Sequence, residues 1–76
     1  MDSITYENRG KNKIKVILEP LAHEYTLDVG SLIEVSPQDD EKVSSVEIYH
    51  FEDSVQIYCW VYTNVRIDGV LQTIYV

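Results

Sequence analysis

The sequence predicts an all-β fold, a small antiparallel β-sandwich or a partly open barrel of about seven strands. Apolar residues recur at every second position in nearly every segment, as in Ile14, Val16 and Leu18. Turn residues separate these short segments, and none of them shows the period of 3.6 residues that is typical of a helix. With 76 residues, the chain is predicted to form a single β-sandwich-like domain, 1–76.

The first half of the chain supplies four predicted strands. A turn follows the first at Gly10, and the second ends at Pro20 because proline cannot donate to a strand ladder. A glycine turn at Gly30 separates the third from the fourth. The polar segment 36–45 is then predicted to be a loop. The four predicted strands lie within segments 3–8, 11–20, 24–30 and 31–37.

Two further strands, SVEIYHF and VQIYCWVY, are predicted to form a hairpin. If Glu52 and Asp53 make its turn, Ile48 pairs with Ile57, and one aliphatic face forms. A slip by one residue would mix the two faces, so the alternation supports this register. Another hairpin is predicted at the Asp-Gly pair between NVRI and VLQTIYV, a favoured two-residue turn.

The same register gathers aromatic residues on the face that points away from the aliphatic side. Patches of several hundred Å² on soluble proteins are usually covered or used for binding, and tyrosine and tryptophan are enriched in binding hot spots. This face is therefore either a protein-binding surface or interior, covered by the other sheet or by the crossover 20–24. The predicted protein-binding residues are Tyr49, Phe51, Tyr58, Trp60 and Tyr62, with Glu47 in an acidic rim.

The net charge of −7 is unevenly distributed. Four of the six basic residues lie between Arg9 and Lys15, and only two basic residues accompany the eleven acids after Val16. Without a broad basic face, we expect no binding of nucleic acid. The acidity either steers a basic protein partner or serves solubility alone. The first residues lack a leader pattern and the longest apolar run is 57–62, so we expect a cytoplasmic protein without membrane contact.

The sequence lacks a motif for catalysis or metal binding. His23 and His50 lack zinc-site spacing, and His50 is predicted to lie partly buried on the aliphatic face. The acidic run 39–41 lacks the glycine and the final glutamate of a calcium loop. The single cysteine, Cys59, cannot form an internal disulfide and is predicted to be a core residue. We therefore predict no enzymatic activity, no cofactor and no metal.

The chain combines a Leu-Glu-Pro strand end, a Tyr-x-Leu strand, a glycine turn, an apolar strand and a closing Asp-Gly turn. These positions are Leu18, Glu19, Pro20, Tyr25, Leu27, Gly30, Val35, Asp68 and Gly69. The pattern resembles a family of small bacterial all-β proteins with no established activity, although Leu21 stands where that pattern has tryptophan. The resemblance covers most of the chain and implies an all-β fold and no catalytic residue.

Two functions follow as hypotheses. The first is a non-enzymatic protein-binding module, such as an acidic immunity or anti-defence inhibitor that docks on a basic protein target. The second is a structural β-module that self-associates, as a homodimer or as a subunit of a larger assembly. A molecular mass that rises with protein concentration would favour the second.

Overall fold

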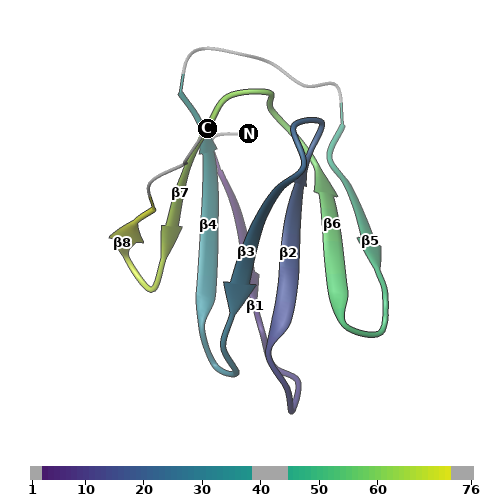
Figure 1. Ribbon diagram of the computed structural model, residues 1–76. Coiled ribbons are helices and arrows are strands. Elements are labelled where there is room, and N and C mark those ends of the chain that lie inside the picture. Colours follow the sequence, from purple (N-terminus) through teal and green to yellow (C-terminus); the bar gives the residue numbers. More distant parts are fainter. Residues whose placement is uncertain (1–2, 39–44, 73–76) are drawn as a thin grey trace.

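The structure is a computed structural model that describes residues 3–38 and 45–72. The described residues form eight strands in two four-stranded sheets, which confirms the predicted small β-sandwich (Figure 1). None of these residues belongs to a helix long and apolar enough to cross a membrane. The strands are β1 (Ile4–Glu7), β2 (Ile14–Glu19), β3 (His23–Leu27), β4 (Leu32–Pro37), β5 (Glu47–His50), β6 (Ser54–Tyr58), β7 (Thr63–Ile67) and β8 (Val70–Leu71).

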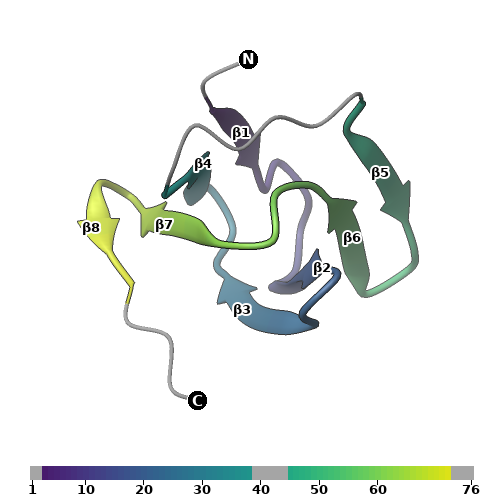
Figure 2. The same ribbon diagram turned by 90° about the horizontal axis from the view of Figure 1, so that it is seen from above.

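Sheet A has the strand order β1-β4-β7-β8, and sheet B has the order β3-β2-β6-β5. The two sheets curve around a common core, as the view from above shows (Figure 2). Burial of apolar side chains between the sheets is the main stabilising contribution to a fold of this kind. The buried apolar residues are Ile4, Val16, Leu18, Leu27, Ile33, Val35, Val55, Ile57, Trp60 and Val65.

One strand pair departs from the predicted antiparallel arrangement. β2 and β6 lie side by side and run parallel, with Val16 paired to Val55 and Leu18 to Ile57. Hairpin turns fix the direction of strands that follow each other in sequence. Between β2 and β6, however, the chain forms β3, then β4 in sheet A, and then β5. Their relative direction is therefore set by core packing and not by local turn chemistry.

The predicted hairpin of β5 and β6 is confirmed, with its register. Ile48 pairs with Ile57, and the N–H group of Phe51 donates to the C=O group of Ser54 at 2.8 Å. Glu52 and Asp53 thus form the two-residue turn. The alternation of apolar and polar positions was sufficient to specify this pairing.

The strand predicted to continue to Tyr62 ends at Tyr58. Residues 59–62 instead carry the chain across one end of the sandwich, from β6 in sheet B to β7 in sheet A (Figures 1 and 2). Trp60 lies in this crossing and is 2% exposed. A tryptophan in the middle of the crossing closes the end of the core between the two sheets.

A buried asparagine, Asn8, ties three segments together at one end of the sandwich. Its side chain is 3% exposed, and its Nδ2 atom donates to the C=O groups of Asn12 and Leu27 at 2.9 and 3.0 Å. Its Oδ1 atom accepts from the N–H group of Gly10 at 3.0 Å. The β1–β2 connection is therefore fastened to the end of β3 by hydrogen bonds of one side chain.

The predicted Asp-Gly turn joins β7 to β8. Asp68 and Gly69 have φ angles of 50° and 83°, as a tight hairpin turn of this type requires. The Asp68 carboxylate accepts from the N–H group of Leu32 at 2.9 Å and from the hydroxyl group of Ser31 at 2.7 Å. These two hydrogen bonds hold the pKa of Asp68 below its ordinary value of 3.8.

We expect Asp68→Asn to lower the stability at neutral pH and to remove part of its pH dependence. Because the folded pKa is lowered, the charged form of Asp68 stabilises the fold above the unfolded pKa of 3.8. That contribution is lost as the pH falls through the folded pKa. Asparagine tolerates the positive φ, so the turn itself is kept. Urea unfolding between pH 7 and pH 2 should show the gap between the two proteins closing in acid; a gap that is constant with pH would contradict this.

Candidate protein-binding surface

Strand β5 lies at the edge of sheet B, and all four of its residues are exposed. Its inward side carries Ile48 and His50, and both remain exposed. There the ring of His50 contacts the ring of Tyr6 from β1, with centroids 5.7 Å apart. The prediction that His50 is partly buried is therefore wrong, because His50 lies on the edge strand of sheet B and remains exposed there.

The outward side of β2, β6 and β5 holds two tyrosines and two carboxylates. The register places Tyr58 between Glu19 of β2 and Glu47 of β5. The ring of Tyr49 stands edge-on to that of Tyr58, with centroids 5.7 Å apart and an interplanar angle of 87°. We name these four residues the tyrosine site.

A hydrogen bond orients one ring of the tyrosine site. The hydroxyl group of Tyr49 donates to the carboxylate of Glu47, two residues away on the same face. This hydrogen bond and the negative charge of Glu47 raise the pKa of Tyr49 above its ordinary value of 10.0. The tyrosine therefore remains protonated at neutral pH and keeps the proton that it donates in this hydrogen bond.

The tyrosine site has the chemistry of a receptor for a positive charge. Aromatic ring faces attract Lys and Arg side chains through their quadrupole, and nearby carboxylates add Coulomb attraction. The chain has no lysine or arginine between positions 45 and 65. In the described part of the chain, ion pairs engage Glu7, Asp28 and Glu34, and none engages Glu19 or Glu47.

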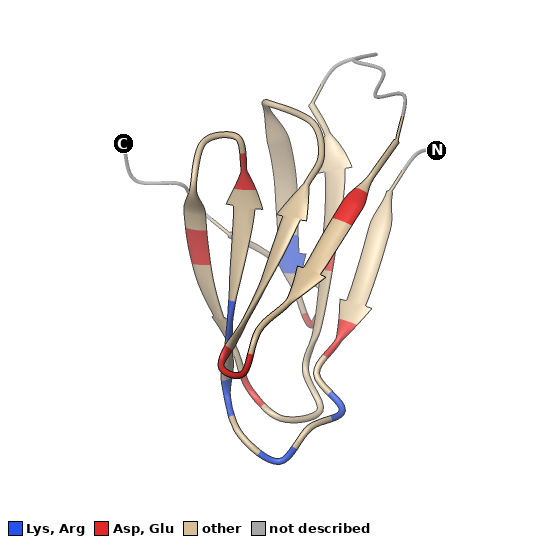
Figure 3. Cartoon of the chain, turned by 90° about the vertical axis from the view of Figure 1, so that its right-hand side faces the viewer, with Lys and Arg blue, Asp and Glu red and all other residues tan. Residues whose placement is uncertain are grey.

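The basic residues gather elsewhere. Arg9, Lys11 and Lys13 lie in the connection between β1 and β2, at one end of the sandwich, while carboxylates lie both on the strands and in turns at that same end (Figure 3). The tyrosine site lies near the opposite end of sheet B, because Glu19 is the last residue of β2. The surface around it is therefore acidic.

The structure separates the six residues predicted for protein binding. Tyr49, Tyr58 and Glu47 lie together in the tyrosine site, and Phe51, 58% exposed, follows at the far end of β5. Tyr62 is also exposed, but it lies at the end of sheet A, where its C=O group accepts from the N–H group of Gln38.

The placement of Trp60 on the aromatic surface is wrong. The prediction assumed that the alternation of β6 continued beyond Tyr58, which would have turned Trp60 outward. Because the strand ends there and the chain bends toward sheet A, the phase changes and the ring enters the core. Cys59, next to it, is half-buried and packs against the core, in agreement with its prediction.

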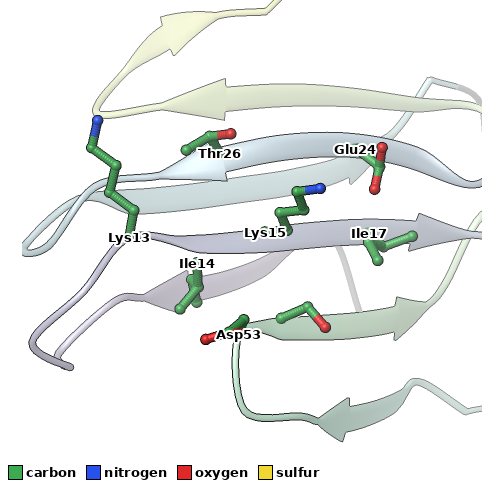
Figure 4. A pocket seen from close by; sticks show the side chains of 8 residues that line it. Lys13, Ile14, Lys15, Ile17, Glu24, Thr26 and Asp53 are labelled. Carbon is green, nitrogen blue, oxygen red and sulfur yellow. The ribbon is translucent and has the colours of Figure 1, made fainter.

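A second feature of the outward face of sheet B is a shallow depression of about 590 Å³ (Figure 4). It collects two lysines and two carboxylates, so its charges balance. Among the described residues, no group of three His, Cys, Asp or Glu side chains is placed to hold a metal ion. Asp39, Asp40 and Glu41 lie outside the described residues. The depression is lined by Lys13, Ile14, Lys15, Ile17, Glu24, Thr26, Asp53 and Ser54.

Comparison with known proteins gives no relative from which a function could be transferred. No protein-family model matches the chain, and neither a curated protein nor a solved structure matches it. The resemblance to small bacterial proteins therefore stays a prediction, and the function has to be inferred from the residues of the chain itself.

Proposed function

We propose that this protein is a non-enzymatic protein-binding module whose tyrosine site receives a Lys or Arg side chain of a basic protein partner. The observation that carries the proposal is the position of Tyr58 between Glu19 and Glu47, with Tyr49 edge-on beside it. An inhibitor of the immunity or anti-defence kind, directed against a basic enzyme, would use such a surface.

The exposure of the site supports this proposal. Tyr49 and Tyr58 are 47% and 40% exposed, so both rings still have surface to bury against a partner. The flanking carboxylates would accelerate the approach of a basic protein and select against acidic ones. The chain's own net charge of −7 acts in the same direction.

Self-association through β5 is the alternative function, because this edge strand is open to pairing. Two copies, however, would bring together two sets of Glu47, Glu52 and Asp53. These carboxylates repel one another across a contact that contributes no lysine or arginine from either hairpin. A basic partner is therefore the favoured occupant of this surface.

The test uses purified basic proteins encoded by genes next to that of this chain. Each is passed over the immobilised protein at two salt concentrations, and the affinity and the association rate are measured. We expect Tyr58→Leu to weaken binding about thirtyfold, by about 2 kcal/mol, as for a central aromatic contact. Glu47→Gln should mainly slow association, and less so at high salt.

Tyr62→Leu is the matched control, because Tyr62 is exposed but lies outside the tyrosine site. Its affinity should equal that of the unchanged protein. Equal affinities for all three variants would place the binding surface elsewhere. If no basic protein binds and the mass of the protein doubles with concentration, self-association is the function instead.

A further inference from the structure

We propose that the partner presents an extended segment with basic residues at alternate positions, which pairs with the open edge of β5 as an additional strand of sheet B. This inference rests on the proposed function and specifies how the partner is held. The tyrosine site would then receive one basic side chain, while hydrogen bonds of the main chain would supply the rest of the contact.

The register shows which main-chain groups are open to such a strand. Phe51 and Ser54 form a hydrogen-bonded pair at the turn. Hydrogen-bonded and non-hydrogen-bonded pairs alternate along an antiparallel ladder, so Tyr49 and Glu47 also direct their main-chain groups toward β6. The N–H and C=O groups of Ile48 and His50 consequently point away from β6, toward the outer edge.

This edge lacks most of the devices that usually prevent strand addition. Natural edge strands are protected by charged side chains, above all lysine, by proline, by a bulge or by being very short, and of these β5 carries one charge, Glu47. Segment 45–51 contains no proline, lysine or glycine. The four β5–β6 pairs run in unbroken register, without a bulge. At the edge of sheet A, by contrast, β8 has only two residues.

Charge and side-chain pattern identify the chemistry of the incoming strand. On the outward face it would lie beside Glu47 and Tyr49, which favour lysine or arginine at alternate positions. On the inward face it would cover Ile48, which is 42% exposed, so apolar residues are favoured at the positions between. An extended segment that alternates basic and aliphatic residues meets both requirements.

The experiment uses three eight-residue peptides and amide hydrogen exchange measured by NMR. The first peptide alternates lysine with valine, the second replaces each valine with proline at the same charge, and the third alternates glutamate with valine. We expect the lysine–valine peptide alone to slow exchange at Ile48 and His50 at least tenfold at saturation. Tyr49, already bonded to β6, should change little.

Ile48→Pro tests the same edge from the protein side. Proline removes an N–H group that points outward, a position where edge strands tolerate it. The variant should bind the lysine–valine peptide at least tenfold more weakly, whereas Ile48→Thr, which keeps the N–H group, should lose less than threefold. If Ile48→Pro does not fold, the exchange measurement on the unchanged protein decides alone.

The outcomes separate this inference from the proposed function. Strand addition is overturned if the lysine–proline peptide binds equally well, or if bound lysine–valine peptide leaves the exchange at Ile48 and His50 unchanged. Should Tyr58→Leu still weaken the binding of a basic partner, the proposed function stands without it. If amide exchange at Ile48 slows as the concentration of the protein alone is raised, a second copy of the chain occupies the edge and the inference is overturned.

Discussion

Replacing Trp60 with alanine is expected to destabilise the fold by about 3–5 kcal/mol, the usual cost of removing a buried tryptophan side chain. Trp60 is the largest of the buried side chains and closes the end of the core where the chain crosses between the sheets. A 76-residue domain has a total stability of roughly 4–11 kcal/mol. The variant should therefore lose a large part of its stability and unfold at a much lower urea concentration.

Urea unfolding followed by circular dichroism measures this loss, because Trp60 is the only tryptophan and fluorescence would vanish with it. Tyr62→Ala is the matched control: an aromatic residue in the same crossing, 61% exposed, whose removal should change the stability by less than about 0.5 kcal/mol. If Trp60→Ala unfolded like the unchanged protein and lost only partner binding, the core placement would be wrong.

The sequence predicted well what local patterns determine. Alternation gave the all-β class, and it gave the pairing of Ile48 with Ile57 across the β5–β6 turn. Turn chemistry located the bend at Asp68 and Gly69, where both residues take positive φ. Each of these features depends on residues that are close in sequence, so its signal is complete within a short segment.

Features that depend on distant segments were missed. The end of β6 has no local signal, since the apolar run from Ile57 to Tyr62 reads as one strand with two apolar sides. Trp60 turns inward because the chain leaves sheet B after Tyr58 and crosses to β7 of sheet A, which is distant in the fold from the local pattern of β6. The same holds for the parallel pairing of β2 with β6, which no turn links directly.

The tyrosine site was predicted in part for the same reason. Tyr49, Tyr58 and Glu47 belong to one hairpin, and its register placed them on one face. Glu19 comes from β2, which joins this face only through the parallel pairing, so its position beside Tyr58 could not be predicted from hairpin geometry. The acidic and aromatic character of the site was predictable from the sequence, but the placement of a carboxylate on each side of the Tyr58 ring was not.

Substitution of Asn8 is expected to have the second-largest effect on stability. No role was predicted for this residue, because its partners, Asn12 and Leu27, lie in other segments. Asn8→Leu keeps the approximate volume but leaves the buried C=O group of Leu27 unsatisfied, at about 1–3 kcal/mol, and removes two part-buried hydrogen bonds, to Asn12 and from Gly10. We expect a loss of about 2–4 kcal/mol in urea unfolding, against less than about 0.5 kcal/mol for the exposed Asn12→Ala.

Relative to the unchanged protein, Asn8→Asp should lose about 3 kcal/mol or more of stability at neutral pH. The new carboxylate would be buried against two C=O groups, and only the N–H group of Gly10 would donate to it. Burial raises the folded pKa of the new carboxyl above its unfolded value of about 3.9. The penalty is therefore complete above the folded pKa and disappears as the pH falls toward the unfolded value, where the protonated group can again donate one hydrogen bond. Asn8→Leu has no titrating group and keeps its deficit, relative to the unchanged protein, at every pH. Equal pH profiles for the two variants would mean that the side chain at position 8 is hydrated and not buried as the structure shows it.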